Sequence, residues 1–527
     1  MDPKDPTEGT PAAHRRARTS RRKPKKGAKR FLKPVAIAAG SCVVLSTVSG
    51  WLYYEHLNGN IRHGALNTST VDVPKSKANA FGQTPLNILL IGSDGRGDKR
   101  DCALGGACDS GPPHADVEML LHLSADRSNA SVLSIPRDTV VDIPACTDPR
   151  TQQSYSAMRA IITASLGNGG PGCVVGAWQQ LTHIHIDHYM MVDFGGVVDM
   201  ADAVGGVPVC VDHNVSDNQA YTDKYGKKHV EGSHLKLKEG TTTIQGVQAL
   251  EWLRTRHAFE DGTDIGRTHA QHLYMNSLAR QMQSKSTLAN PLKLNALADQ
   301  ATKSLTVDDD LGSLVSLAQL AREMNKVPTN RLTMATMPFE YIPTDKAHVQ
   351  PAPDASRVFD MIANDIPLDK NGKPKPTATT SAAPTKAPVD KAAVRIAVRN
   401  GGGVTHRAKA LSDFLITEGF TGAVVDTDPT PAEVTAIEYP AAQQAQAQAV
   451  AAAIGLPAAK LQVSGTADHP TLVIGTDWSS GTDFRATLPK AGALPTTAVS
   501  QNAESDKDQC MAVNMQKDRT GHYIYSW

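Results

Sequence analysis

Apolar residues form one long run near the start of the chain, "PVAIAAGSCVVLSTVSGWLYY" at residues 34–54, which has no charged side chain. About 20 apolar residues cross the hydrocarbon core of a bilayer as a helix. Residues 1–33 hold twelve Lys and Arg against three acidic residues, a net charge of +9. Because Lys and Arg stay on the cytoplasmic side, we expect a single-pass signal anchor in the cell membrane, with a cytoplasmic N-terminus and an extracytoplasmic body. A cleaved signal peptide is the alternative.

Beyond a polar stalk at residues 55–84, short apolar runs alternate with segments of helical periodicity. "NILLIGSDGR", "VEMLLHLS" and "ASVLSIPRDT" are typical of strands, and "HYMMVDFGGVVDMADAVGGVPVCV" of a strand, a helix and another strand. Strands that alternate with helices predict an α/β domain over residues 85–368, with a mixed central sheet covered by helices on both faces. "PLKLNALADQATKSL" and "LGSLVSLAQLAREMN" have the spacing of helices that face a core.

A change in composition separates a second domain from the first. Residues 369–391 are rich in Pro, Thr, Ala and Lys, which predicts a linker. Residues 392–480 then alternate strand and helix patterns, so we expect a smaller second α/β domain there. Residues 481–527 are expected to form a flexible tail.

Seven cysteines bear on the compartment of the chain. Cys42 lies in the apolar run, and the other six lie after it, at positions 102, 108, 146, 173, 210 and 510. An even number fits an oxidising compartment and up to three disulfides, among fifteen possible pairings. Our hypotheses are a bridge from Cys146 to Cys173, which would tie a loop to the sheet, and one from Cys102 to Cys108. That leaves Cys210 with Cys510. The spacings are unlike those of zinc-binding cysteines.

Charge is concentrated in "ALEWLRTRHAFEDGTDIGRTHAQ", residues 249–271, which gathers Arg254, Arg256 and Arg267. The chain as a whole carries +1, so the part after the +9 arm carries −8, and general basicity does not explain the cluster. Surface ion pairs, each contributing about 0 to 1 kcal/mol, are the alternative reading. Arginine forks match phosphate oxygens bidentately, and Arg267 and Gln271 share one helical face. The cluster therefore predicts a diphosphate site.

Carboxylates stand at the ends of two neighbouring predicted strands. Asp94 follows the first strand and Asp116 begins the next, and in open α/β sheets such positions border the ligand crevice. Two carboxylates there can hold Mg²⁺, or Mn²⁺ as the alternative ion, with water and substrate phosphates completing its shell. Arg137 follows a third strand, where Pro136 ends regular pairing. Turn or cap carboxylates are the alternative interpretation.

Eight motifs occur in an order that resembles a known family. They are "NILLIGSDGR", "ADVEMLLHL", "SIPRDT", "GGPGC", "IDHYMMVDF", "DAVGGVPV", "ALEWLRTR" and "DIGRTHAQ". Over roughly residues 85–285 the chain resembles the LytR-CpsA-Psr (LCP) family of bacterial cell-wall glycopolymer transferases. The segment 392–480 is similar to the LytR C-terminal domain.

The resemblance implies a Mg²⁺-dependent phosphotransferase. Such an enzyme moves a glycopolymer from a polyprenyl diphosphate carrier to a peptidoglycan hydroxyl, commonly the 6-hydroxyl of a muramic acid. The partners would be that glycopolymer, peptidoglycan and membrane lipid, with no nucleic acid. A polyprenyl-diphosphate phosphatase or pyrophosphatase and a non-catalytic wall-binding scaffold are the alternatives.

The matching motifs also assign roles to residues. Asp94 and Asp116 would hold the metal, and Asp94 is the candidate base for the acceptor proton. The diphosphate would be held by Arg137, Arg254, Arg256, Arg267 and Gln271. Asp94, Asp116 and Arg137 form the expected catalytic set. The chain departs from the family pattern at three positions, where many members have Arg, Asn and Arg respectively: Ala270, Thr163 and His114.

Overall fold

A computed structural model gives the fold of the chain over residues 47–527, apart from gaps at residues 77–82, 98, 106–107, 109–110, 223–226, 285–288, 371–388, 429, 433, 458–459 and 503–508. The predicted basic arm, most of the predicted anchor and most of the predicted linker lie outside these residues. Residues 47–60 are helical. Of the helices in the described part, none is long and apolar enough to cross a membrane. The chain divides into the units Met1–His56 and Leu57–Trp527, and the second contains both predicted α/β domains.

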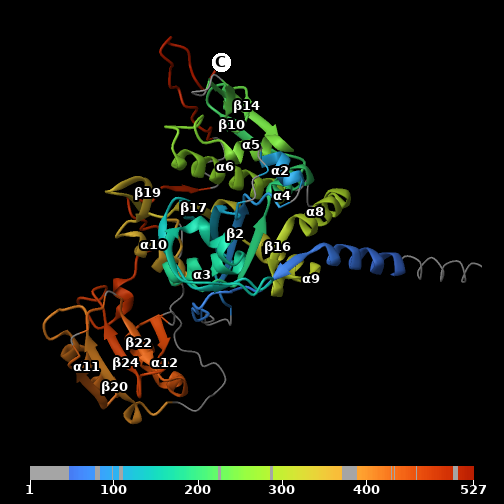
Figure 1. Ribbon diagram of the computed structural model, residues 1–527. Coiled ribbons are helices and arrows are strands. Elements are labelled where there is room, and N and C mark those ends of the chain that lie inside the picture. The colour runs from blue at the N-terminus through green and yellow to red at the C-terminus, as the bar shows by residue number, and fades with distance from the viewer. Residues whose placement is uncertain are drawn as a thin grey trace, which may run out of the picture. The chain divides into compact units, whose positions relative to one another are not determined.

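The larger domain is built on an eight-stranded sheet (Figure 1), with the order β1-β16-β9-β2-β3-β4-β17-β25. β2, β3 and β4 are antiparallel neighbours, whereas β9 runs parallel to β2 and β17 parallel to β4. This mixed sheet confirms the predicted α/β class. In chain order the strands are β1 (Arg62–Gly64), β2 (Leu86–Ser93), β3 (Ala115–Leu123), β4 (Ala130–Ser134), β9 (His188–Val192), β16 (Leu305–Asp308), β17 (Leu332–Thr336) and β25 (Ser500–Asn502).

Both faces of this sheet are apolar. Successive side chains of a strand point to opposite faces, so neighbouring apolar residues of one strand belong to two different cores. Leu89 and Leu120 face one core cluster, which contains residues of α3 and α10, including the fully buried Trp178. Ile88 and Leu121 face another, into which α9 packs. The helices of the domain are α2 (Lys99–Gly105), α3 (Pro171–Thr182), α4 (Phe194–Ala203), α5 (Val247–Arg254), α6 (Asp264–Met282), α8 (Pro291–Ser304), α9 (Leu314–Asn325) and α10 (Ala355–Ala363).

Small two-stranded sheets surround the central one. β18 and β19 form a hairpin after β17, and β10 pairs with β15 beside α6. The paired strands are β5 (Val140–Ile143) with β8 (Met158–Ile161), β6 (Cys146–Thr147) with β7 (Ser154–Tyr155), β10 (Val207–Val211) with β15 (Gly240–Ile244), β11 (Val215–Ser216) with β14 (Lys236–Leu237), β12 (Gln219–Thr222) with β13 (Lys228–Glu231), and β18 (Phe339–Ile342) with β19 (Asp345–Pro351). Short 3₁₀ helices cover Ile162–Asn168, Asp309–Leu311 and Thr329–Arg331.

The segment expected as a stalk differs from the prediction. Its residues Arg62–Gly64 form β1, which pairs in parallel with β16. Ser69 makes a bridge to Cys146 and lies where a side chain on Gly176 of α3 would clash with it. Polar composition alone suggested a free segment, but Leu57, Ile61 and Val73 are buried, and Asn67 donates to Gln179 of α3.

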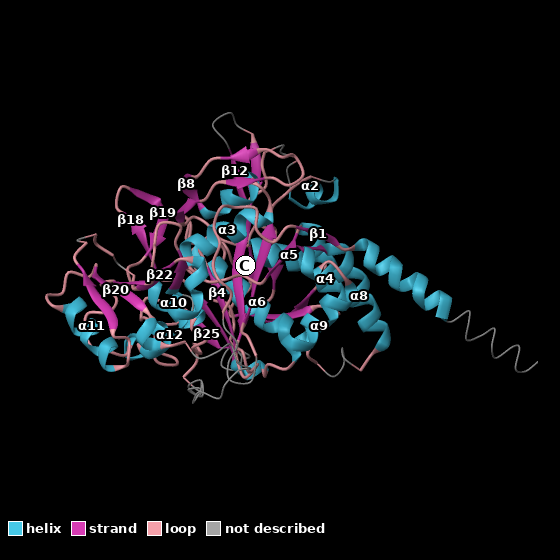
Figure 2. Ribbon diagram, turned by 90° about the horizontal axis from the view of Figure 1, so that it is seen from below, coloured by secondary structure: helices cyan, strands magenta, loops and turns pink. Residues whose placement is uncertain are grey.

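The second domain has its own sheet and core, as predicted (Figure 2). Its strand order is β21-β20-β24-β22-β23, and the helices α11 and α12 contact these strands. Trp478, which is fully buried, packs in its core. The elements are β20 (Arg395–Asn400), α11 (Arg407–Thr417), β21 (Gly422–Asp426), β22 (Ala436–Tyr439), α12 (Gln444–Ala453), β23 (Leu461–Val463) and β24 (Thr471–Ile474), with 3₁₀ helices at Lys391–Ala393, Ala441–Gln443 and Phe484–Thr487.

The C-terminal residues also differ from the expected flexible tail. β25 extends the large sheet by pairing antiparallel to β17. Cys510 forms a disulfide with Cys210 of β10. Met511 and Val513 are buried in a core cluster that includes Phe259. Few apolar residues stand in this segment, so its sequence pattern gave no sign that those few fill a core built by the first domain.

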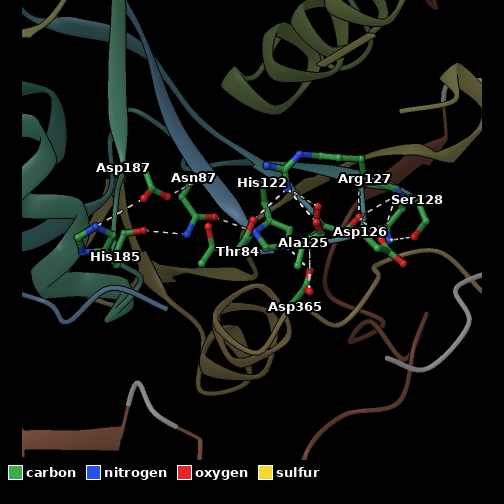
Figure 3. Close-up of polar contacts among 12 residues, drawn as sticks. Thr84, Asn87, His122, Ala125, Asp126, Arg127, Ser128, His185, Asp187 and Asp365 are labelled. Carbon is green, nitrogen blue, oxygen red and sulfur yellow. Dashed lines mark hydrogen bonds and ion pairs between the residues drawn. The ribbon is translucent and has the colours of Figure 1, made fainter. Parts of the chain in front are cut away.

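A buried polar network lies at the end of the sheet where β2 begins (Figure 3). The main-chain nitrogen of Asn87 donates to Asp187 over 2.9 Å, and the Asn87 side chain shares a 2.7 Å hydrogen bond with His122. His122 in turn contacts Asp365, just after α10, at 3.2 Å. Because buried polar groups need hydrogen-bond partners, this network fixes the end of β2 that lies away from Asp94.

Candidate active site

A cavity of about 480 Å³ opens where β2 ends and β3 begins. Its lining includes side chains from the ends of β2 and β3, from the loop after β4 and from the helices α5 and α6. Six of the seven predicted site residues are among them: Asp94, Asp116, Arg137, Arg254, Arg267 and Gln271. The tertiary structure therefore brings together groups that stand up to 177 positions apart in the sequence.

The antiparallel pairing of β2 with β3 places the two carboxylates at one end of the sheet. In its register Ser93 lies opposite Ala115, after an irregularity at Gly92. Asp94 and His114 continue this pairing. The Asp94 nitrogen donates to the His114 carbonyl over 3.1 Å, and the His114 nitrogen donates to the Asp94 carboxylate over 2.6 Å. Asp94 is thus held beside the strand that carries Asp116.

The carboxylates of Asp94 and Asp116 suit a hard cation only if a bound substrate supplies further oxygen ligands. No group of three or more His, Cys, Asp and Glu able to hold a metal occurs among the residues that the structure describes. Asp94 and Asp116 line the same cavity and can supply two carboxylates. Mg²⁺ keeps several waters and is often bound by one or two carboxylates together with phosphate oxygens. The residues therefore fit a cation that arrives with a phosphorylated substrate.

Arg137 connects two groups of predicted site residues, the carboxylates expected to hold the metal and the arginines expected to hold the diphosphate. Its guanidinium lies 3.0 Å from Asp116, 3.5 Å from Asp138 and 3.6 Å from Asp264. Burial lowers the pKa of Arg137, but the three carboxylates outweigh it and the net shift is upward. The side chain therefore stays charged in a half-buried position.

Arg254 ends α5 and is held by a small covalent loop. It donates hydrogen bonds to the carbonyls of Leu104, at 3.0 Å, and Gly105, at 3.4 Å, and its guanidinium lies over the ring of Phe194. Burial is the main cause that lowers the pKa of Arg254, and the nearby charge of Arg96 lowers it further. Two neighbouring guanidinium groups repel each other, so an anion between them would be stabilising.

Arg267 and Gln271 lie one turn apart on α6, and both are buried. Arg267 forms an ion pair with Asp264 in the same first turn. Burial is the main cause that lowers the pKa of Arg267, although Asp264 partly offsets it. The amide of Gln271 donates to the Leu253 carbonyl over 3.2 Å. This face of α6 therefore presents hydrogen-bond donors to the cavity, and they are largely shielded from water.

Arg256 is the one predicted site residue that does not line this cavity. It lines a second cavity of about 410 Å³, whose lining it shares with Arg137 and Asp138. These two residues also line the first cavity, so the two spaces are adjacent. Thr255 turns the chain between Arg254 and Arg256, since its φ of −61° and ψ of 123° are extended rather than helical.

The three departures from the family pattern lie in two different environments. His114 and Thr163 line the first cavity, so their smaller or uncharged side chains change its surface. Ala270 is fully buried in the core cluster that contains Trp252, whose indole nitrogen donates to the Ala270 carbonyl. An arginine at position 270 would not fit that core.

The three hypothesised disulfides are present in the structure: Cys102 with Cys108, Cys146 with Cys173, and Cys210 with Cys510. The first closes the loop whose carbonyls bind Arg254. The second joins β6 to the first turn of α3. The third attaches the C-terminal segment to β10. The first bridge is therefore linked to the cavity through Arg254.

Four charged residues at or near the cavity were not among the predicted site residues, although the sequence places Asp138 beside Arg137 at the end of the third predicted strand. Arg96, Asp138 and Asp193 line the first cavity, and Glu118 lies just beneath it, two residues after Asp116 on β3. Arg96 and Asp138 stood inside quoted motifs, so their proximity to Asp94 and Arg137 was the available signal. Burial raises the pKa of Glu118 to about 8, although a hydrogen bond from Trp178 opposes this shift. Nothing in the pattern of β3 marked that burial.

Comparison with known proteins identifies the family. The model of the LytR_cpsA_psr family matches residues 53–362, and that of the LytR cell envelope-related transcriptional attenuator matches residues 393–478. The cell wall biosynthesis protein LcpA of Corynebacterium glutamicum is 30% identical over 274 residues, which cover 48% of this chain and 49% of LcpA. The polyisoprenyl-teichoic acid–peptidoglycan teichoic acid transferase TagV of Bacillus subtilis is 24% identical over 294 residues, covering 55% of this chain and 68% of TagV.

Solved structures match at lower similarity. The LytR-Csp2A-Psr enzyme from Actinomyces oris has 19% identity and a TM-score of 0.40, covering 57% of this chain and 96% of that one. The chain spans about half the length of the curated relatives it matches first, with 49% of LcpA and 56% of the probable cell wall biosynthesis protein LcpB. The match of the first family model, in contrast, extends over more than half of the 527 residues. The chain therefore belongs to the LytR-CpsA-Psr family.

Proposed function

We propose that this protein is a phosphotransferase that moves a glycopolymer from a polyprenyl diphosphate carrier onto a peptidoglycan hydroxyl. The observation that carries this proposal is the convergence of Arg96, Arg137, Arg254 and Arg267 in one cavity with the carboxylates of Asp94 and Asp116. Such a set matches a diphosphate accompanied by a hard cation. Relatives whose names describe teichoic acid transfer to peptidoglycan support the choice of substrates.

The chain's own residues would act mainly by position and charge. Phosphoryl transfer depends on orienting the groups and stabilising charge on the phosphate oxygens. Arg137 and Arg267 would bind the oxygens from the α6 side of the cavity, and Arg254 from the α5 side. Asp94 and Asp116 would hold Mg²⁺, which when bound supplies positive charge against the charge that develops on the phosphate oxygens. The Gln271 amide would add a neutral donor.

The transfer itself exchanges one phosphorus–oxygen bond for another. The acceptor hydroxyl oxygen attacks the glycan-bearing phosphorus, and the bond from that phosphorus to the bridging oxygen breaks. Lipid monophosphate leaves, and the hydroxyl proton passes to a carboxylate of the cavity. Asp94 is the candidate from the sequence. The expected anchor at residues 34–54 would keep the catalytic domain at the outer surface of the cell membrane, where lipid-linked precursors and peptidoglycan meet.

The test is an assay of the purified chain with a polyprenyl-diphosphate saccharide donor, soluble peptidoglycan fragments and Mg²⁺. We expect a product in which saccharide and acceptor are joined through one phosphate, together with polyprenyl monophosphate. Release of free saccharide phosphate in place of that product, with peptidoglycan present, would assign a phosphatase instead. Binding of peptidoglycan without any turnover of donor would assign a scaffold.

A further inference from the structure

A second cavity of about 410 Å³ adjoins the proposed diphosphate site. Arg137 and Asp138 line both spaces, so a group in the second cavity can reach one in the first. The β18–β19 hairpin forms one wall, and the loop before α6 together with its first turn forms another. None of the motifs that indicated the diphosphate site includes this hairpin.

Two cationic side chains that line this cavity have no ion-pair partner in the described part of the chain. The Nε of Arg256 is buried and has no hydrogen-bond partner. Across the described part of the chain, neither Arg256 nor Lys346 of the hairpin takes part in an ion pair. The carboxylates that line the cavity, Asp138 and Asp264, are instead occupied by Arg137 and Arg267. An unpaired buried donor is costly, so an anionic ligand would be stabilising there.

The hairpin also presents an aromatic surface to the cavity. Tyr341 is 45% exposed, and Phe339 holds it at an angle of 87° with the ring centroids 6.2 Å apart. Both rings line the cavity. An exposed, positioned aromatic ring beside hydrogen-bonding groups is suited to the apolar face of a sugar ring.

We propose that the second cavity binds the acceptor, a peptidoglycan sugar that carries a carboxylate. The sugar would stack on Tyr341, and its carboxylate would lie between Arg256 and Lys346. This inference rests on the proposed transferase function and names the acceptor subsite of the same site. A neutral sugar would leave the two cations unpaired, which is why we assign the cavity to an acidic glycan.

A third cavity also adjoins the first. It has a volume of about 740 Å³ and shares Ser93, Arg96 and Asp193 with the first cavity, but no lining residue with the second. Of its three arginines, Arg62 and Arg150 have carboxylate partners. The second and third cavities therefore each adjoin the diphosphate cavity through different residues.

This arrangement defines the exchange of bonds. The acceptor oxygen, entering from the second cavity, bonds to the glycan-bearing phosphorus while the bond to the bridging oxygen breaks. Lipid monophosphate is the leaving group. For an acceptor in the second cavity, Asp138 replaces Asp94, the candidate from the sequence, as the proton acceptor, because Asp138 lines both the first and second cavities, whereas Asp94 lines the first alone.

The experiment uses the full chain with Tyr341→Ala and Lys346→Ala, and Glu340→Gln as the matched control. Glu340 stands beside Tyr341 on β18 but bonds to Gln350 across the hairpin and does not line the cavity. Initial rates of transfer are measured against the concentrations of donor and acceptor separately. The acceptor is a peptidoglycan disaccharide-peptide with free carboxylates, or the same fragment with those carboxylates amidated. The melting temperature of each variant is measured in parallel.

We expect Lys346→Ala to raise the acceptor KM about three- to five-fold for the free carboxylate only, the effect of losing one exposed ion pair. Tyr341→Ala should raise it about five- to ten-fold for both fragments, through loss of one stacking contact. Donor KM and the control should be unchanged. A raised donor KM with an unchanged acceptor KM would assign the cavity to the donor glycan instead. Unchanged constants in both variants would overturn the inference while leaving the transferase intact. A wild-type chain without transfer product would reject the proposed function, and this inference with it.

Discussion

The guanidinium of Arg254 donates a 3.0 Å hydrogen bond to the carbonyl of Leu104, inside the loop that the Cys102–Cys108 disulfide closes. A cationic side chain at the end of α5 is thereby held by a loop that a disulfide closes. The cysteines of that disulfide stand at least 146 positions earlier in the chain. This relationship explains how Arg254 is kept in the lining of the cavity despite the repulsion from Arg96.

Arg254→Ala should lower the rate of transfer by about 10- to 100-fold, as expected for the loss of hydrogen bonds to a charged group. Arg254→Lys should restore little, because an ammonium group lacks the bidentate fork. Initial rates and melting temperatures of the purified variants test this. Arg159→Ala, which removes an exposed ion pair with Asp142, is the control and should leave both unchanged. Normal turnover in Arg254→Ala would contradict the assignment.

Replacing Cys102 and Cys108 together by Ser should lower the rate of transfer while the protein remains folded. Without the bridge, the carbonyls of Leu104 and Gly105 no longer hold Arg254 in place. We expect about a 3- to 30-fold loss, smaller than that of Arg254→Ala because the guanidinium is still present. Combining both changes should give no further loss than Arg254→Ala alone. Additive losses would show that the bridge acts elsewhere.

Asp94→Ala and Asp116→Ala should each lower transfer by at least about 100-fold and remove its dependence on Mg²⁺. Titration of Mg²⁺ against the residual rate provides the measurement. Asp142→Ala is a matched control, because this exposed aspartate forms an ion pair away from the cavity. A variant at Asp94 or Asp116 that keeps a normal rate and an unchanged Mg²⁺ requirement would refute the metal role.

Glu118 should make the protein less stable as the pH rises from about 4.5 to 8. Burial raises the pKa of Glu118 from 4.5 to about 8, so over this range the folded state binds a proton that the unfolded state has lost. Stability contributed by the protonated form is therefore present below pH 4.5 and lost by pH 8. Glu118→Gln removes this dependence.

Denaturant unfolding of wild type and Glu118→Gln at pH 5, 6.5 and 8 tests the titration. The variant should gain roughly 2 to 4 kcal/mol relative to wild type between pH 5 and pH 8. A constant difference between the two proteins across this range would mean that Glu118 titrates alike in the folded and unfolded states.

Met511→Ala should destabilise the larger domain by about 2 to 5 kcal/mol, because this methionine is fully buried beside Phe259. Arg519→Ala, in the same C-terminal segment but exposed, should change stability by less than about 0.5 kcal/mol. Thermal unfolding of both variants provides the comparison. Equal melting temperatures would indicate that the C-terminal segment does not contribute to the core.

Most of the fold followed from patterns within the sequence. The strand that ends at Ser93, the helices at Leu314–Asn325 and Arg407–Thr417, and the two α/β domains arise from local periodicity, which reflects the period of each backbone conformation. The identities of six cavity residues also followed from motifs. Five of them are Arg or Asp, the side chains that phosphate and metal chemistry favour, and the sixth is Gln271.

Tertiary structure alone decided which of these groups meet. Arg256 follows Arg254 by two residues, yet an extended Thr255 directs it into a different cavity. Ala270 stands beside Gln271 but faces the core. The C-terminal segment fills a core whose other walls are made hundreds of residues earlier, and Glu118 becomes buried under elements distant in sequence. The sequence determines conformations and chemical types because these depend on neighbouring residues. Contacts and burial depend on the packing of distant elements, which local patterns do not record.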